Sequence, residues 1–217
     1  MNSLSRWLLL FLLAVCQPLR ADDPSIRVQL DTSEVPHLDD WGQEAKQLIM
    51  RWHPRIENLL PTRNVKAVDR VKLRLKKSDK GVGATSGSTI TISSHWIEKH
   101  PEDLGLVFHE LVHVVQGYPS GKPWWITEGI ADYLRWAIYE GKDLSWFPLT
   151  NEPQGYKKGY RITAGFFLWL ETDVSPGIVK RINTAMRNGT FSEQLFQDET
   201  ERSLDELWNE YVRFKKQ

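Results

Sequence analysis

The sequence H-E-L-V-H at residues 109–113 constrains this chain more than any other stretch. It lies inside an apolar run, residues 104–115, that predicts an α-helix. Residues four apart lie on one face of a helix, so His109 and His113 can reach a single zinc ion from the same side. Glu110 can then lie beside a metal-bound water and accept its proton. Short motifs also arise by chance, and a histidine on an apolar helix is often a core side chain, so a third ligand is needed.

A second predicted helix supplies that ligand. Glycines and prolines between residues 117 and 123 end the first helix, and a new one is expected from Thr127, as its N-cap, toward Glu140. Glu128 falls in its first turn, where the carboxylate can point back at the two histidines and complete a three-ligand zinc site with one open position. Asp132, one turn further along the same face, is placed to accept a hydrogen bond from a ligating histidine.

Both acids also have a simpler explanation. Glu128 can be a solvated acid favoured by the helix dipole, and Asp132 an exposed carboxylate paired with Arg135 or Lys142. Their joint E-x-x-x-D spacing shortly after H-E-x-x-H favours the zinc site instead, with one zinc ion per chain.

Three blocks resemble a known family. They read H-E-L-V-H-V-V-Q-G-Y (109–118), E-G-I-A-D-Y-L-R (128–135) and G-Y-R-I-T-A-G-F-F-L-W-L-E (159–171). They are similar to the basic secretory protein family of plants and bacteria, regarded as zincin-type peptidases, over roughly residues 65–211. An H-E-x-x-H motif followed by a helix with E-x-x-x-D is the gluzincin arrangement.

The resemblance implies a role for each site residue. His109, His113 and Glu128 correspond to the zinc ligands, Glu110 to the general base and Asp132 to the acid that supports a ligand. This chain departs from the family in not being basic, because it carries 28 Lys and Arg against 28 Asp and Glu. That balance also argues against a nucleic-acid partner.

The N-terminus predicts export. Residues 1–21 read as a signal peptide, with Arg6 before an apolar core at residues 7–16 and a cleavage site before Asp22. The apolar run is too short to span a bilayer, and no later stretch approaches the length needed. An uncleaved anchor and lipid attachment at Cys16 are the alternatives.

The mature chain, residues 22–217, is expected to form a single domain. Cys16 is the only cysteine, so this domain would contain no disulfide and no thiol nucleophile. We expect it to be secreted or periplasmic, with no membrane span after signal removal, and its oligomeric state is left open.

The pattern of elements predicts an α+β fold with strands and one long helix in the N-terminal half and helices in the C-terminal half. The expected strands are 26–30, 71–75 and 89–93, and the expected helices include 38–60, kinked at Pro54, then 156–171, 176–187 and 203–215. The basic run at residues 70–77 alternates with apolar residues, as on the solvated face of a strand. The resemblance implies a zincin-like, mixed sheet and a cleft between the halves.

Residues for substrate binding are expected at this cleft. Thr89, Ile90 and Thr91 are the candidates for an edge strand that binds the substrate backbone, with an internal hairpin strand as the alternative. Trp124 and Trp125 are next to Glu128 in sequence and could line the cleft.

The oxyanion of the reaction requires a donor besides zinc. Tyr160, which opens the third block, is the first choice, and Arg161 and Tyr156 are weaker ones. The alternative for Tyr160 is a tyrosine packed at a helix start with its hydroxyl in water.

The sequence therefore predicts an exported zinc metallopeptidase acting on peptides or proteins. Two alternatives stay open: a secreted binding module without catalysis, and a zinc amidase acting on cell-wall material.

Overall fold

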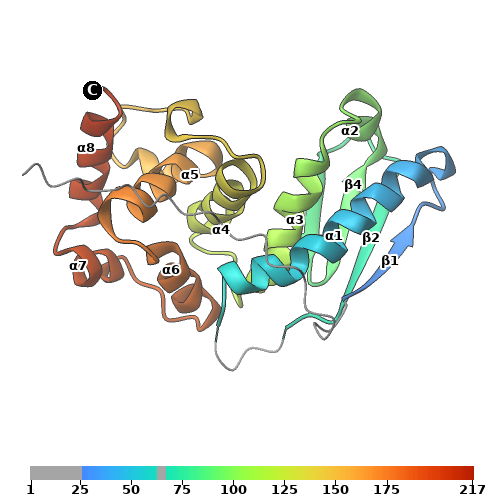
Figure 1. Ribbon diagram of the computed structural model, residues 1–217, viewed down its shortest axis with the longest axis horizontal. Coiled ribbons are helices and arrows are strands. Elements are labelled where there is room, and N and C mark those ends of the chain that lie inside the picture. The colour runs from blue at the N-terminus through green and yellow to red at the C-terminus, as the bar shows by residue number, and fades with distance from the viewer. Residues whose placement is uncertain (1–25, 63–66) are drawn as a thin grey trace, which may run out of the picture.

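The computed structural model describes residues 26–62 and 67–217 (Figure 1). The predicted signal peptide, including Cys16, lies outside these residues. The protein has an α+β fold in two parts: a small mixed sheet packed against helices, and a helical C-terminal half (Figure 1).

The sheet has four strands in the order β1-β2-β4-β3, where β1–β2 and β2–β4 are parallel and β3–β4 is antiparallel. The strands are β1 (Arg27–Asp31), β2 (Arg70–Lys76), β3 (Gly83–Ser86) and β4 (Thr89–Ser93). The predicted edge at residues 89–93 is wrong, because the glycine-containing stretch before it forms β3 and pairs with it. The edge strands are β1 and β3, and β3 is the one next to β4.

One face of the sheet is apolar and the other polar. In β2, Val71, Leu73 and Leu75 are buried, whereas Arg70 and Lys76 are exposed, which confirms the predicted alternation. The apolar face packs against α1 (Asp39–Leu59), mainly over β1, and against α3 (Leu104–Gln116), over β3 and β4. The short α2 (Ser94–Lys99) connects β4 to α3.

Helix α3 begins and ends at identifiable residues. The Asp103 carboxylate accepts a hydrogen bond from the Leu106 backbone N–H at 3.1 Å, as an N-cap does. Gly117, with φ +48°, ends the helix in the left-handed region that glycine adopts without strain. The motif at residues 109–113 is therefore helical, as predicted.

The C-terminal half is helical throughout. Its α-helices are α4 (Trp124–Asp132), α5 (Tyr160–Trp169), α6 (Ile178–Arg187), α7 (Gln194–Thr200) and α8 (Leu204–Phe214). Two π-helical segments, Tyr133–Tyr139 and Leu170–Val174, continue α4 and α5, and short 3-10 turns lie at Leu144–Trp146 and Gly155–Lys158. A further 3-10 turn, Pro36–Leu38, lies in the N-terminal half, before α1.

Two predicted helix starts are wrong. Helix α4 begins at Trp124, directly after Pro123, so Thr127 lies inside it and Glu128 falls in its second turn. The helix expected from residue 156 is broken at Gly159, whose φ of +69° separates the 3-10 turn from α5. Side-chain patterns do not report such backbone breaks.

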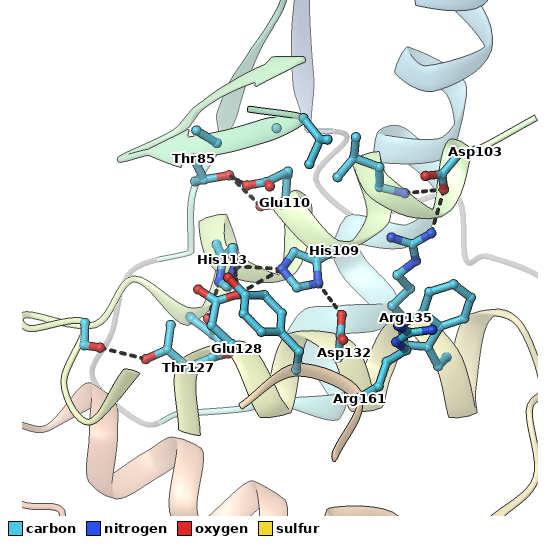
Figure 2. A pocket seen from close by; sticks show the side chains of 18 of the residues that line it. Thr85, Asp103, His109, Glu110, His113, Thr127, Glu128, Asp132, Arg135 and Arg161 are labelled. Atoms are coloured by element: carbon cyan, nitrogen blue, oxygen red, sulfur yellow. Dashed lines mark hydrogen bonds and ion pairs between the residues drawn. The ribbon is translucent and has the colours of Figure 1, made fainter. Parts of the chain in front are cut away.

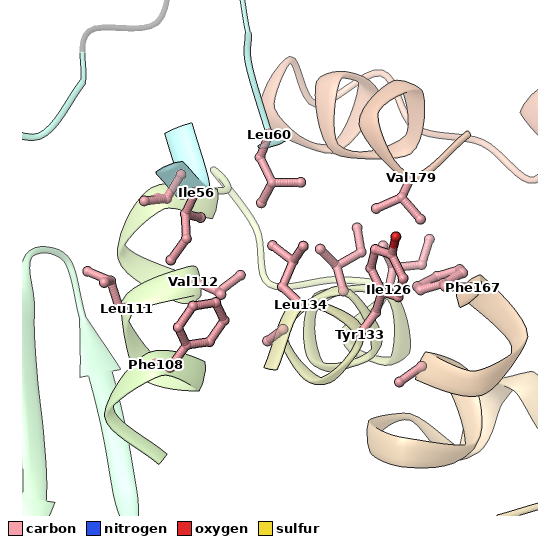
Figure 3. Close-up of a cluster of buried hydrophobic side chains, with 14 of the residues drawn as sticks. Ile56, Leu60, Phe108, Leu111, Val112, Ile126, Tyr133, Leu134, Phe167 and Val179 are labelled. Atoms are coloured by element: carbon pink, nitrogen blue, oxygen red, sulfur yellow. The ribbon is translucent and has the colours of Figure 1, made fainter. Parts of the chain in front are cut away.

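Apolar side chains continue from one half to the other. Phe108 and Val112 of α3 lie between the sheet and the helical half, and Ile126 of α4 meets Phe167 of α5 (Figure 3). Among the described residues, no helix is both long enough and apolar enough to cross a membrane.

Candidate metal centre

A pocket of about 1200 Å³ lies where the two halves meet. Its lining comes from β3, α3, α4 and the start of α5, so elements far apart in sequence contribute to one site. His109, His113 and Glu128 lie together in it, with Glu110 on the side of the sheet (Figure 2).

Three donor atoms form a triangle in this pocket. The Nε2 atoms of His109 and His113 are 3.1 Å apart, and Oε2 of Glu128 lies 3.2 Å from the first and 3.5 Å from the second. In a tetrahedral zinc site with bonds of 2.0–2.1 Å, neighbouring ligand atoms lie about 3.3–3.5 Å apart. The triangle therefore has the size that a zinc ion requires.

Each histidine is also held through its second ring nitrogen. His109 Nδ1 lies 2.8 Å from Oδ1 of Asp132, which is buried and therefore not the exposed carboxylate of the simpler explanation. His113 Nδ1 lies 2.7 Å from Oε1 of Gln116, whose amide nitrogen donates to the Thr127 carbonyl oxygen at 2.9 Å. Such partners fix the tautomer and ring orientation of histidines that bind metals.

The charges of this cluster are coupled. Burial lowers the pKa of His109, but hydrogen bonds to Asp132 and Glu128 outweigh it and raise the pKa to about 9. Burial raises the pKa of Glu128, but hydrogen bonds from His109 and His113 outweigh it and lower the pKa to about 2. These two shifts favour a protonated imidazole beside ionised carboxylates, and a divalent cation bound there would compete with that proton.

Glu110 faces the sheet edge. The Thr85 hydroxyl lies 2.7 Å from Oε2 of Glu110 and 2.9 Å from its backbone oxygen (Figure 2). A Cβ at Gly83 would lie only 2.9 Å from Oε1, so glycine leaves room for this carboxylate. Strand β3 thus hydrogen-bonds one carboxylate oxygen through Thr85 and leaves space for the other at Gly83.

Tyr160 lies at the rim of the pocket. Its side chain is 52% exposed, and its ring stacks near that of His109, with centroids 6.4 Å apart. Burial, followed by the charges of Glu128, Asp132 and Glu110, raises the pKa of its phenol. Its φ of +46° is strained for a tyrosine, and such strain clusters at functional sites.

Several predicted cleft residues lie elsewhere. Thr89, Ile90 and Thr91 belong to the internal strand β4 and do not line the pocket. Trp125 is 4% exposed and packs against core aromatic rings. Trp124 is 47% exposed, but it packs over Gly159 and Tyr160 beside the pocket.

Of the other two candidates for the oxyanion donor, only one lies at the pocket. Tyr156 is buried and donates its hydroxyl to Asp205 at 2.7 Å, away from the pocket. Arg161 lines the pocket.

Thr85 and Gln116 were not predicted. Gln116 lies three residues after His113, so helical spacing could have indicated it, whereas the contact of Thr85 with Glu110 depends on tertiary packing.

Comparison with known proteins gives one match. A family model described as "BSP: Peptidase of plants and bacteria" matches residues 38–211, beginning earlier than the resemblance at residue 65. Neither the search of curated proteins nor the search of solved structures gave a match. The family match spans strands β2, β3 and β4, both site helices and most of the helical half, and the chain belongs to the BSP family of plant and bacterial peptidases.

Proposed function

We propose that this protein is an exported zinc-dependent metallopeptidase that hydrolyses peptide bonds of proteins or peptides. The observation that carries the proposal is the triangle formed by His109, His113 and Glu128, with edges of 3.1–3.5 Å. Membership of a peptidase family supports the reaction class. The predicted signal peptide supports export, and the pocket between a sheet and a helical half supports a zincin-like architecture.

His109, His113 and Glu128 would hold the zinc ion, which lowers the pKa of water to about 7 and so supplies a nucleophile near neutral pH. Glu110 accepts the proton of the attacking water and returns it to the leaving amine. The Thr85 hydroxyl orients the Glu110 carboxylate for both transfers.

Tyr160 is the donor proposed for the developing oxyanion. Its raised pKa keeps the phenol protonated, so it can donate a hydrogen bond across the working pH range. Asp132 and Gln116 hold the two imidazoles in place.

The proposal is tested by metal content and turnover in residues 22–217. We expect about one zinc per chain by elemental mass spectrometry, and cleavage of an unfolded protein such as casein. The Glu110→Gln variant should keep its zinc and lose about 10²–10⁴-fold in turnover, the range contributed by general acid–base catalysis. His113→Ala should lose most of the metal.

Three results would contradict the proposal. A folded parent protein that takes up no zinc when zinc is offered would exclude the metal site. Full turnover by Glu110→Gln would remove Glu110 from the mechanism, and a zinc-loaded parent that cleaves no peptide bond would leave a binding function.

A further inference from the structure

The charged side chains of the pocket wall nearly all have hydrogen-bond partners within the protein. Apart from the histidines, the charged side chains that line it are Asp103, Glu110, Glu128, Asp132, Arg135 and Arg161. Asp103 lies 2.6 Å from Nη2 of Arg135 and accepts from the Trp96 indole at 3.0 Å. The other three acids are hydrogen-bonded to Thr85 or to the two histidines. No acid of the pocket is left for a further cation.

The two arginines of the pocket differ in whether an acid pairs with their charge. The Arg135 guanidinium is bonded to Asp103 and, at 3.2 Å, to Glu140, so its charge is fully matched. Arg161 has no carboxylate within 4 Å in the described ranges 26–62 and 67–217. It is the one arginine of the lining whose charge the described part of the chain leaves without an acid.

An aromatic ring lies beside Arg161. Its guanidinium is 5.9 Å from the Trp146 ring centroid, the rings of Trp146 and Trp136 are 4.6 Å apart, and the Arg135 guanidinium lies 4.1 Å from the Trp136 ring. The Arg161 side chain is exposed, and this indole contact supplies no negative charge to it.

The position of Arg161 relates it to the candidate metal centre. It follows Tyr160, whose ring lies 6.4 Å from that of His109, at the start of α5. Arg161 and Arg135 both lie on the side of the pocket beyond Asp132, away from His113 (Figure 2). A group bound by Arg161 would therefore belong to a substrate residue near the bond that is cut.

We propose that Arg161 forms a subsite for a substrate carboxylate, so that the protein prefers peptides with Asp, Glu or a free C-terminus close to the scissile bond. This inference rests on the proposed peptidase function. A guanidinium presents paired N–H donors that match the two oxygens of a carboxylate. Arg161 is exposed at the pocket wall, so a bound carboxylate can reach it directly, whereas a neutral substrate would leave it to water.

Peptide binding tests the subsite without requiring turnover. Zinc-loaded Glu110→Gln protein is titrated with fluorescent decapeptides of Ala and Phe that carry one Glu at each position in turn, and with the same set carrying Gln. Every peptide is made with a free and with an amidated C-terminus. We expect binding about tenfold tighter, a difference of about 1.4 kcal/mol, for Glu over Gln at one position or for the free over the amidated C-terminus. The two comparisons distinguish a side-chain carboxylate from a terminal one.

Variants assign that preference to Arg161. Adding Arg161→Gln should reduce it to within about twofold while leaving affinity for the amidated Gln peptides unchanged, and Arg161→Glu should reverse it, so that Gln peptides bind more tightly than Glu peptides. Lys157→Gln is the control, because it removes an exposed positive charge four residues earlier that does not line the pocket.

Cleavage of the same peptides by the parent protein separates the two proposals. Cleavage without any carboxylate preference, or a preference that survives in Arg161→Gln, overturns the subsite and leaves the peptidase proposal standing. Binding that depends on Arg161 in a zinc-loaded parent protein that cleaves neither the peptides nor casein supports the carboxylate subsite and overturns the peptidase function.

Discussion

At the scale of single residues, both histidines of the candidate metal centre and the proposed general base each have a hydrogen-bond partner that supports them. Asp132 supports His109, Gln116 supports His113, and Thr85 supports Glu110. These hydrogen bonds hold the supported side chains in one orientation, as a preorganised site requires. Replacing a supporting residue should therefore affect geometry while leaving the chemistry of the supported group intact.

Thr85 provides the sharpest test of this arrangement. Thr85→Val keeps the shape of the side chain but removes the hydroxyl that lies 2.7 Å from the Glu110 carboxylate. We expect kcat to fall about tenfold, because a base that is free to rotate spends less time aligned with the attacking water. KM and zinc content should stay unchanged in steady-state kinetics and elemental analysis.

Thr85→Ser is the matched control, because it restores the hydroxyl and should recover kcat to within about threefold of the parent. An equal loss in Thr85→Val and Thr85→Ser, or a loss confined to KM, would mean that Thr85 acts through strand packing and does not orient Glu110.

The residues that lie together in the candidate metal centre could be predicted from the sequence more fully than the side chains that hold them. His109 and His113 follow from helical spacing alone, and Asp132 from its position one turn beyond Glu128. Thr85 lies on a strand that contacts α3 only in the folded chain, so no local pattern could pair it with Glu110. Arg161 was a lower-ranked candidate for the oxyanion donor. Its lack of a carboxylate partner could be recognised only from the folded pocket.

At the scale of secondary-structure elements, the close approach of α4 and α5 positions Glu128. Gly129 follows Glu128 and faces Thr163, and a Cβ built at Gly129 would lie 2.9 Å from Cβ of Thr163 and 3.0 Å from the Phe167 ring. Thr163 is buried, and its hydroxyl donates to the Tyr156 carbonyl oxygen, so it cannot easily move aside.

Gly129→Ala is predicted to destabilise the protein by about 1–3 kcal/mol through overpacking. The better helix propensity of alanine, about 1 kcal/mol, offsets only part of this cost. Denaturant unfolding of both proteins measures the difference. Gly121→Ala is the control, because no atom lies within 4 Å of a Cβ there, and it should change stability by less than about 0.5 kcal/mol. Equal effects at the two positions would contradict tight packing between α4 and α5.

Element types were predicted more reliably than their edges. The long helix at residues 38–60 and the strand at residues 71–75 have strong periodicity, and both are present as α1 and β2. The start of α4, the break before α5 and the position of β4 inside the sheet were predicted wrongly. These three features depend on backbone conformation and on which strands pair, and the alternation of apolar residues reports neither.

At the scale of the whole molecule, the candidate metal centre joins the two halves. His109 and His113 come from α3, which packs against the sheet, whereas Glu128 comes from α4 in the helical half. A zinc ion bound to all three would bind the native state and not the unfolded chain, so it should raise stability in proportion to the logarithm of free zinc above Kd. Removal of zinc by EDTA should lower Tm.

The stability that the protein gains when zinc binds should depend on pH, because zinc and a proton compete for Nε2 of His109. In the metal-free protein the pKa of His109 is raised from 6.5 to about 9, so its protonation stabilises the fold fully below pH 6.5, and this contribution is lost as pH rises through 9. The pKa of Glu128 is lowered from 4.5 to about 2, so its contribution is present above pH 4.5 and is lost as pH falls through 2. Between pH 6.5 and 9, zinc therefore displaces a proton that His109 still holds, and releasing that proton costs less free energy as pH rises.

We predict that the rise in Tm caused by a fixed concentration of free zinc is larger at pH 8.5 than at pH 6. Differential scanning calorimetry with a zinc buffer, and with EDTA as the metal-free reference, measures the gain at each pH. One displaced proton changes the apparent zinc affinity tenfold per pH unit. The free energy by which zinc stabilises the protein should therefore be roughly 3 kcal/mol larger at pH 8.5 than at pH 6. His113→Ala should show little gain at either pH. A gain in the parent that does not change with pH would mean that His109 carries no proton in the metal-free protein, and that its bonds to Asp132 and Glu128 hold a neutral imidazole already prepared for metal.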